Sequence, residues 1–580
     1  MLDFDFDLIH EATEQARRKR QELAGAPPFI RLWQNGPGED EGLILVGIVR
    51  DSIKGQFQTL KNKPGSGTLL LRADHWMSQK VIKLPTRARY GEKQNLVVTV
   101  ETMGGVNRWS GLMHHWKVTK DKEGIYLLEI TFIDDLQYLD FLLGPPNPAL
   151  PIPIFQFPRV LPLFGPSKFI ISLLILMNVA RVESGIWQLP DDPFSLTSWV
   201  SGFDISTWQC YVKCDGFFTD SSLWTILATR MNKISSVIAD ALEDSQQVLK
   251  YRRILTADGE TPADYGLSYV SHCNNGALVL EVADESGFYE ADGTPTGGGI
   301  AGGFWRSITT FLDGFVETEE TFIDDDETIY PNQYYEAGWF TSLPFWSSWT
   351  VPKSPWVVVR DSPWSAIETA ELTHAPASAV KALCGGDNPY ADQAIELAIT
   401  AIGDIAGYFL LGGFSSAGDI AATVIMPFLR GTVFAWLEWK NFGRTQSLGW
   451  AHLWEVFQQG AENNAWSLSA IAALRAGFLS TKAQTSHQFK VTGGTGAFYP
   501  GLSASIGQRI GSTLEYVYDY IFISQMEEMT LAWDITSSSD HEWSISVGNN
   551  RAAEPISLRQ TRLVMKALDT ISEIGVRMLS

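Results

Sequence analysis

The sequence predicts a β-rich α+β protein with two small β-barrel-like modules, a mixed α/β middle part and an apolar helical hairpin. Three observations predict this class. The chain has 580 residues, enough for about four modules of roughly 150 residues each. Hydrophobic residues make up 45% of it and charged residues 19%, a composition typical of folded proteins. Short apolar segments separated by turn residues recur towards both ends.

We expect five segments in chain order. They are an N-terminal helix with the first barrel-like module (1–145), a proline-rich arm with an apolar helix (146–203), a mixed α/β domain with glycine-rich and acidic loops (204–390), an apolar helical hairpin with further helices (391–486), and a second barrel-like module with a closing helix (487–580).

The first segment begins with Met1 to Arg20, which is acidic, then helical and then basic, and lacks the apolar core of a secretory signal. The apolar run Leu43–Val49 reads as a strand. After a turn at Asn62–Gly67 the strand Thr68–Arg72 follows, which suggests a hairpin. Three more strands complete the pattern of a small antiparallel barrel: Asn95–Glu101, Gly111–Val118 and Ile125–Ile133.

The middle of the chain mixes both kinds of element. The prolines of Pro145–Pro166 exclude a helix or a central strand and indicate an extended arm. Lys168–Ala180 is too short to span a bilayer and is predicted to be a buried helix. Strands are expected at Trp208–Lys213 and Ala277–Val282. A helix is expected from Ser221 to Ala241, with an apolar stripe of Ile226, Met231, Ile234 and Ile238.

The last part returns to strands. Helical segments are expected at Leu453–Phe457 and Leu468–Ala476, and a closing helix at Leu558–Leu579. Between them the predicted strands are Phe489–Thr492, Arg509–Asp519, Ile521–Met526, Thr530–Thr536 and Trp543–Val547.

Two apolar arms between Ala391 and Trp439 flank the glycine-rich turn Gly412–Gly418 and predict a helical hairpin. Its candidate membrane or pore-plug residues are Ile405, Tyr408, Phe409, Leu410, Leu411, Phe414, Ile420, Val424, Phe428, Phe434 and Trp436. The hairpin approaches transmembrane length, so membrane insertion is one interpretation. Packing in the centre of an oligomer is favoured, because Asp404, Pro427 and Arg430 are costly in hydrocarbon. A hairpin stored in an assembly and later released against a membrane combines the two interpretations.

The net charge of the chain limits which partners it can bind. With 44 Lys and Arg against 66 Asp and Glu, the formal net charge is -22, which repels a phosphate backbone. This argues against sequence-directed nucleic-acid binding. An acidic wall would instead let a DNA duplex slide past it.

No pattern of catalytic or metal-binding residues stands out, and we predict no enzyme activity, metal or cofactor. Cys210, Cys214, His272 and Cys273 offer a zinc set, but buried thiols are favoured. The acidic run from Asp313 to Glu327 reads as a solvated loop in preference to a calcium site. A glycosidase pair could be formed by two of the acids Glu317, Glu319, Glu320 and Asp324. Such a pair is defined by the distance between its carboxyl groups in space, which spacing in the sequence does not give. His114 and His115 are expected on opposite faces of a strand.

Four tryptophans in an aromatic stretch are candidate glycan or subunit contacts: Trp339, Trp346, Trp349 and Trp356. Aromatic faces stack on sugar rings, which suggests a receptor-binding module. Contacts to a neighbouring subunit are favoured, since tryptophan is enriched at protein interfaces.

Several stretches carry a resemblance. The stretches GLILVGIVRDSIKGQFQTLKNKPGSGTLLLRADHWMSQKVI, NRWSGLMHHWKVT and IYLLEITFIDDLQYLDFLLGPPNP resemble the opening of minor tail proteins from siphophages of actinobacteria. Those proteins belong to the baseplate or tail-tip hub. HQFKVTGGTGAFYPGLSASIGQRIGS and LAWDITSSSDHEWSISVGNNRA are similar to the C-terminal half of that family.

The resemblance implies a structural subunit of the virion tail tip, assembled in the host cytoplasm. It implies a homotrimer that caps the tail tube, mimics sixfold symmetry with two tail-hub modules per copy, holds fibres and opens for DNA ejection. The implied partners are the distal tail protein, the tape measure protein, other minor tail proteins or fibres, the host cell envelope and passing phage DNA. The alternatives are a tail-associated cell-wall hydrolase and a receptor-binding or glycan-binding tail protein.

Overall fold

The structure is a computed structural model, and its described part falls into two units. It describes residues 6–36, 42–152, 155–157, 161–185, 194, 202–285, 300, 303, 321–324, 335–337, 350–352, 357–363, 365, 367–385, 436–457, 474, 477–478, 480–492, 499, 501–502, 504–516, 520–535 and 541–548. The first unit comprises residues 1–304, 318–373 and 485–551, and the second comprises 305–317, 374–484 and 552–580.

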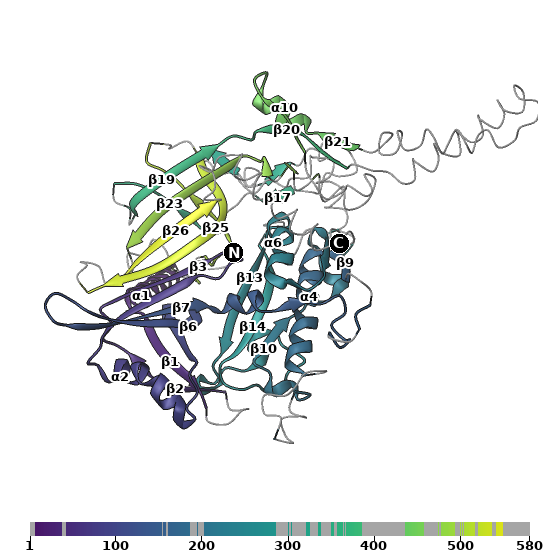
Figure 1. Ribbon diagram of the computed structural model, residues 1–580. Coiled ribbons are helices and arrows are strands. Elements are labelled where there is room, and N and C mark those ends of the chain that lie inside the picture. Colours follow the sequence, from purple (N-terminus) through teal and green to yellow (C-terminus); the bar gives the residue numbers. More distant parts are fainter. Residues whose placement is uncertain are drawn as a thin grey trace, which may run out of the picture. The chain divides into compact units, whose positions relative to one another are not determined.

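A large β-sheet dominates the first unit (Figure 1). Its main path has the order β19-β23-β26-β25-β3-β4-β7-β6-β5-β1-β2, and β15, β24 and β18 attach at β25 and β24. The N-terminal strands are β1 (Phe29–Asn35), β2 (Leu43–Val49), β3 (Lys54–Leu60), β4 (Ser66–Arg72), β5 (Leu96–Thr102), β6 (Asn107–Lys120) and β7 (Tyr126–Asp134). The later strands are β15 (Thr321–Asp324), β18 (Val358–Val359), β19 (Ile367–Ala375), β23 (Gln484–Thr492), β24 (Arg509–Ser512), β25 (Tyr520–Asp534) and β26 (Glu542–Gly548).

The N-terminal and C-terminal strands share this sheet. β25 pairs antiparallel with β3, with Leu531 opposite Phe57. The prediction of a β-rich α+β protein is confirmed, whereas the two separate barrel-like modules are not what the described strands form. Alternating patterns mark strands but not their partners, and here the free edge of β3 is paired by a strand from the far end of the chain.

The predicted hairpin was wrong in its pairing. β2 pairs with β1, and β4 pairs with β3, a strand that the sequence analysis missed. The tight turn lies between β3 and β4, where Asn62 has φ +58. β3 was missed because its sequence is mostly polar, and Phe57 is its one fully buried large side chain.

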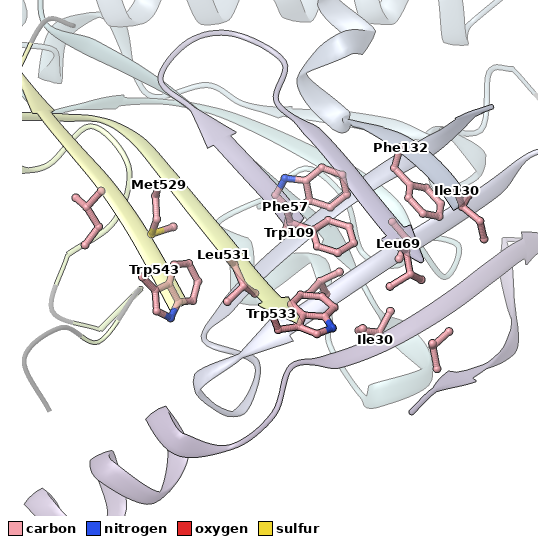
Figure 2. Close-up of a cluster of buried hydrophobic side chains, with 14 of the residues drawn as sticks. Ile30, Phe57, Leu69, Trp109, Ile130, Phe132, Met529, Leu531, Trp533 and Trp543 are labelled. Carbon is pink, nitrogen blue, oxygen red and sulfur yellow. The ribbon is translucent and has the colours of Figure 1, made fainter. Parts of the chain in front are cut away.

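The core of this sheet is built around Phe57 (Figure 2). Its ring lies 4.9 Å from that of Trp109 in an edge arrangement and 5.6 Å from that of Trp533 in a stacked one. Gly55 leaves room for Trp533, because a Cβ there would lie 2.1 Å from the indole carbon Cζ2. Offset and edge contacts of this kind add to the free energy of burial.

Beside the sheet, the first unit holds a second core of helices and a smaller sheet (Figure 1). β10 (Cys210–Lys213), β14 (Ala277–Asp284) and β13 (Gln247–Ile254) lie in the order β10-β14-β13. Helices α4 (Ser167–Glu183) and α6 (Ile234–Asp244) pack against them. The predicted buried helix at Lys168–Ala180 is confirmed: Ile171, Leu174 and Ile175 are fully buried.

One prediction in this region was wrong. The first half of the expected helix Ser221–Ala241 is the strand β11 (Trp224–Thr229), which contains Ile226. Met231 lies at φ +67, so a helix cannot run through it. The proline-rich arm ends in an extended segment, β9 (Leu161–Pro166), which among the described residues pairs with β11 in a two-stranded sheet and is therefore no central strand. Prolines are tolerated there because the pair is not extended into a larger sheet.

The remaining described helices and strands belong to both units. In the first unit they are α1 (Phe6–Gly25), α2 (Trp76–Ile82), α3 (Leu84–Arg87), β8 (Leu143–Gly144), β12 (Asn232–Lys233), β16 (Tyr335–Ala337) and β17 (Thr350–Pro352). In the second unit they are β20 (Ala379–Gly385), β21 (Trp436–Lys440), α10 (Phe442–Leu448) and β22 (Leu453–Phe457). β20 lies between β21 and β22.

Three further expectations fail here. Leu453–Phe457 is a strand instead of a helix, since β20 offers it a paired edge. Trp436, the expected end of a helical arm, lies in β21. Thr321–Asp324, inside the expected solvated acidic loop, pairs with β25. In each case pairing with a distant strand overrides the local pattern.

We expect Phe57→Ala to lower the free energy of unfolding by about 3–5 kcal/mol, because it removes one ring from a contact among three and leaves a cavity. Denaturant unfolding followed by tryptophan fluorescence measures the change. Tyr90→Ala is the matched control, since Tyr90 is 87% exposed. Equal midpoints for the two variants would contradict this account of the core.

Candidate functional site

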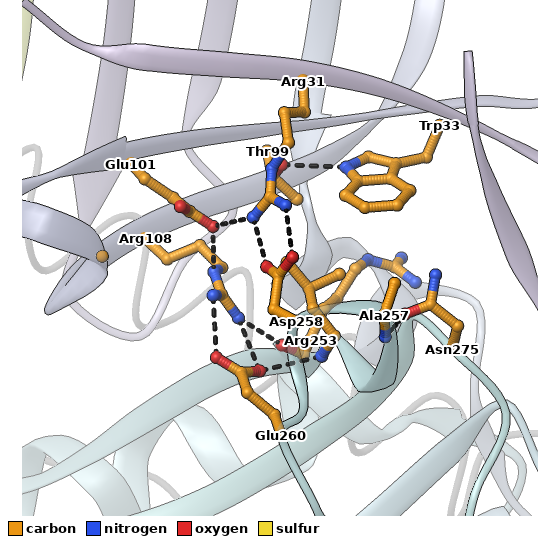
Figure 3. A network of polar contacts seen from close by, with 12 residues as sticks. Arg31, Trp33, Thr99, Glu101, Arg108, Arg253, Ala257, Asp258, Glu260 and Asn275 are labelled. Carbon is orange, nitrogen blue, oxygen red and sulfur yellow. Dashed lines mark hydrogen bonds and ion pairs between the residues drawn. The ribbon is translucent and has the colours of Figure 1, made fainter. Parts of the chain in front are cut away.

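Charged side chains meet between the two cores of the first unit (Figure 3). Arg31 of β1, Glu101 of β5 and Arg108 of β6 come from the large sheet, and Asp258 and Glu260 from the loop after β13. We call these five residues the ion-pair network. The side chains of Arg31, Glu101 and Arg108 are less than 10% exposed, Glu260 is 20% exposed and Asp258 38%.

Arg31 holds two carboxylates at once. Its Nη2 donates to Glu101 Oε1 at 2.6 Å, and its Nη1 donates to Asp258 Oδ1 at 2.9 Å. Burial by itself would lower the pKa of Arg31, but the hydrogen bonds and charges of Asp258 and Glu101 outweigh it and raise that pKa. The guanidinium also lies 4.9 Å from the ring centre of Trp33, so its flat face is covered.

Arg108 connects the same glutamate to the second core. Its Nε donates to Glu101 Oε1 at 2.7 Å, and Nη1 and Nη2 donate to the two oxygens of Glu260 at 2.9 and 2.8 Å. Burial would raise the pKa of Glu260, yet the hydrogen bonds from Arg108 and from the Leu255 N–H lower it to about 2. Glu260 therefore stays charged at any physiological pH.

A second buried pair lies beside this network. Arg253 of β13 donates from Nε and Nη2 to both oxygens of Asp135, at 2.8 and 2.6 Å. Ser110 Oγ donates to the same carboxylate at 2.5 Å. Both ionic side chains are at most 5% exposed. A bidentate pair of this kind fixes orientation as well as distance.

The arrangement suits positioning better than acid-base catalysis. Its carboxylates are each bound to a guanidinium, so the charge of each is compensated by a fixed partner inside the fold. Such a network joins the large sheet to β13 and the loop that follows it. It selects one relative placement of the two cores, because each buried charge has its partner only in that placement.

Asp134, next to the second pair, differs from these acids. It is fully buried, and its oxygens accept from the N–H groups of Gly65 and Leu136 at 2.8 and 3.0 Å. Burial raises its pKa to about 8, although both hydrogen bonds act in the opposite direction. With this pKa, a small change of pH around 8 changes the charge of the Asp134 carboxyl.

A serine and a histidine also meet in this unit, without forming an accessible reactive site. His487 Nδ1 and Ser512 Oγ lie 2.6 Å apart, and both residues are 1% exposed. Burial lowers the pKa of His487 to about 4, while the charge of Asp361 acts to raise it. A substrate cannot reach side chains this deeply buried, so we assign the contact to packing.

Most of the residues singled out in the sequence lie outside the described residues. These are Trp339, Trp346, Trp349 and Trp356, and all the hairpin candidates except Trp436. Trp436 is 53% exposed, and its ring lies 5.6 Å from that of Phe457. Within the described ranges no helix is long and apolar enough to cross a membrane.

The structure also describes residues considered as zinc ligands and the two neighbouring histidines. Cys210 is buried, and burial raises the pKa of its thiol. Among the residues the structure describes, no group of three His, Cys, Asp or Glu side chains is placed to hold a metal ion. His114 and His115 do not point to opposite faces. A bulge in β6 between Met113 and His115 brings their rings to 5.3 Å, because it breaks the alternation of the strand.

Sequence reasoning missed the ion-pair network. A signal existed: Arg31 and Glu101 each occupy a position inside an otherwise apolar strand segment, FIRLW and LVVTVET. A charged residue at an inward position of a strand demands a buried partner. Which partner it meets is not encoded locally, since Arg31 and Asp258 are 227 residues apart.

Sequence comparisons relate this chain to known proteins. The family model described as Siphovirus ReqiPepy6 Gp37-like protein matches residues 29–549. Minor tail protein Gp28 of Mycobacterium phage D29 is 28% identical over 562 residues, covering 89% of this chain and 90% of that protein. Minor tail protein Gp28 of Mycobacterium phage L5 is 27% identical with the same coverage.

Two solved tail proteins also align with most of this chain. A tail protein from Neisseria meningitidis MC58 is 7% identical with a TM-score of 0.39, covering 91% of this chain and 98% of that one. A 43 kDa tail protein of prophage MuSo2 from Shewanella oneidensis is 10% identical with a TM-score of 0.38, covering 90% and 98%.

The sequence matches thus define a class, the siphophage minor tail proteins, and the resemblance predicted from the sequence is confirmed. The chain belongs to the Siphovirus ReqiPepy6 Gp37-like protein family. It is accordingly a component of a phage tail.

Arg108→Ala tests the ion-pair network. We expect it to lower the free energy of unfolding by about 3–5 kcal/mol, because it removes the guanidinium that binds both oxygens of Glu260 and one of the two arginine donors to Glu101. Arg72→Ala is the control: the Arg72–Asp74 pair is exposed, so no measurable change is expected. Thermal and denaturant unfolding report both. A loss for Arg72→Ala as large as for Arg108→Ala would refute the assignment.

Titration of Asp134 makes the free energy of unfolding depend on pH. Its folded-state pKa of about 8 lies above the usual value for Asp, so the stability it contributes is present below about pH 4 and is lost as the pH rises through about 8. The free energy of unfolding of the wild type should fall relative to that of Asp134→Asn between these limits, by at most about 1.4 kcal/mol per pH unit. Urea unfolding of both proteins across pH 4–8 measures it. Parallel curves would contradict a raised pKa.

Proposed function

We propose that this minor tail protein is a structural subunit of the tail tip, a baseplate hub that closes the end of the tail tube as a ring of three copies. The family match over residues 29–549 carries the proposal, because it extends over nearly the whole chain. Two relatives named minor tail proteins, matched along 89% of the chain, support the same role.

The symmetry of the ring follows from the tube that it would close. A tube of sixfold symmetry is matched by three copies if each copy presents two β-rich parts. The large sheet offers such parts, since β1–β7 and β23–β26 are distant in sequence and meet at the β3–β25 pair. The ring would adjoin the distal tail protein and the tape measure protein, and carry fibres or other minor tail proteins on its outside.

The charge of the chain fits a path for DNA. A formal net charge of -22 repels a duplex, so DNA leaving the virion would pass the ring without binding to it. The buried charges of the ion-pair network are compensated inside the fold. We propose that the role is mechanical and not enzymatic, with opening of the ring at the host cell envelope as its functional event.

An apolar segment and four tryptophans also have a place in the proposed ring. The apolar segment 391–435 would fill the centre of the ring before ejection, and could then meet the host membrane. Trp339, Trp346, Trp349 and Trp356 would contact neighbouring subunits, or a glycan receptor.

Electron microscopy of the assembled tail tip tests the proposal directly. We expect a threefold ring of this chain at the end of the tube, with the segment 391–435 on the axis. Labelling with an antibody fragment against this chain provides the control for its position in the tail. A single copy at the tip, or a location along the tube wall, would overturn the hub assignment while leaving the family membership intact.

A further inference from the structure

The three-stranded sheet of the second unit has one covered face and one outer face. On the covered face Ala382 and Cys384 of β20 and Val456 of β22 pack with Leu474 and Phe478. Successive strand residues alternate between the two faces. The residues of the outer face are therefore Lys381, Leu383, Trp436, Glu438, Lys440, Glu455 and Phe457.

The outer face is divided along its strands into an apolar end and a charged part. At the apolar end the rings of Trp436 and Phe457 lie 5.6 Å apart, and they are 53% and 48% exposed. Leu383 is the register partner of Phe457 and is half-buried. Two large exposed rings in contact on a regular sheet mark an interaction surface.

The charged part begins two residues further along the strands, at about 7 Å from the apolar end. There Lys381 Nζ lies 3.2 Å from Glu438 Oε2 of β21 and 2.9 Å from Glu455 Oε2 of β22. Both glutamates are more than half exposed, so this group of three charges is in contact with water.

The apolar end is also where the apolar segment of the chain joins the sheet. β20 ends at Gly385 and β21 begins at Trp436, and these two residues are antiparallel register partners. The two points at which residues 386–435 leave and rejoin the sheet are thus about 5 Å apart. A membrane that takes up the segment 391–435 would therefore lie against this end of the sheet.

The residues of the apolar end suit the surface of a lipid bilayer. Tryptophan is enriched at membrane–water interfaces, where its ring lies at the level of the headgroups. The two lysines and two glutamates of the outer face sum to zero charge, so the face does not attract a polyanion. Three half-exposed side chains also offer much less than the roughly 800 Å² per partner of a stable protein interface. A bilayer interface needs no such area from one face, because the segment beside it is apolar as well.

We propose that the apolar end of the outer face sits in the interface of a lipid bilayer, with Leu383, Trp436 and Phe457 among the headgroups. The group formed by Lys381, Glu438 and Glu455 stays in water. The inference rests on the proposed function, in which the segment 391–435 meets the host membrane. It adds a contact made by the folded sheet itself, and this contact does not depend on anionic lipid.

Flotation of the purified full chain with lipid vesicles tests the contact. We expect the chain to bind phosphatidylcholine vesicles, and addition of phosphatidylglycerol not to strengthen the binding, because the outer face carries no net charge. Trp436→Ala and Phe457→Ala should each weaken the binding about tenfold, since each removes a large ring from the interface.

The matched controls make the same substitutions in the first unit. Trp76 and Phe218 are 56% and 78% exposed, and Trp76→Ala and Phe218→Ala should leave vesicle binding unchanged. Far-UV circular dichroism checks that all four variants are folded.

A polarity-sensitive dye reports which end of the sheet meets the lipid. A dye on Leu383→Cys should emit at shorter wavelength when vesicles are added. A dye on Lys440→Cys, about 13 Å along β21 from Trp436, should not change. The wild-type chain, with its own four cysteines, sets the background.

Three results of the flotation would each overturn the inference: no binding, binding that both ring substitutions leave unchanged, and binding that requires phosphatidylglycerol. A lower assembly mass of Trp436→Ala in analytical ultracentrifugation, without vesicle binding by the wild type, would assign the apolar end to a contact between copies and overturn it too. Electron microscopy of the tail tip tests the hub separately. A threefold ring whose purified chain ignores vesicles would keep the hub and remove this contact, whereas vesicle binding without a ring would do the reverse.

Discussion

Two guanidinium groups, those of Arg31 and Arg108, determine how the halves of the first unit fit together. Apolar burial favours contact between the large sheet and the helical core but does not choose among placements, because it has no direction. Buried charges, in contrast, favour one placement over the others. Each of these side chains has lost its water, so the only placement without a large desolvation cost is the one in which Glu101, Asp258 and Glu260 lie within hydrogen-bond distance.

The local elements of this fold could be predicted where a short apolar segment is bounded by turn residues or prolines. The strands predicted at Leu43–Val49 and Ile125–Ile133 and the helix predicted at Lys168–Ala180 correspond to β2, β7 and α4. The errors lie where a partner decides. Trp224–Thr229 became a strand because β9 pairs with it, although its apolar spacing also fits a helix. Polar strands such as β3 escape detection, since one buried Phe57 gives no period.

The site was beyond prediction for a related reason. Arg108 and Glu260 are 152 residues apart, and Arg253 and Asp135 are 118 apart. A single sequence shows that Arg31 sits in an apolar strand but not which carboxylate it meets. The bulge that brings His114 beside His115 has the same character, because it is set by pairing of β6 with β7 and not by the histidines. Such contacts maintain the shape of the first unit.

The pairing of β3 with β25 also sets the order in which the chain can fold. Gln58 and Glu528, which are joined by a hydrogen bond, are separated by 470 residues. At about 5–20 residues per second, a ribosome needs about 25–95 s to synthesise the second after the first. During that time the outer edge of β3 lacks its final neighbour and Phe57 lacks the stacked Trp533. A prematurely terminated chain would expose that edge permanently, and should aggregate instead of entering a virion.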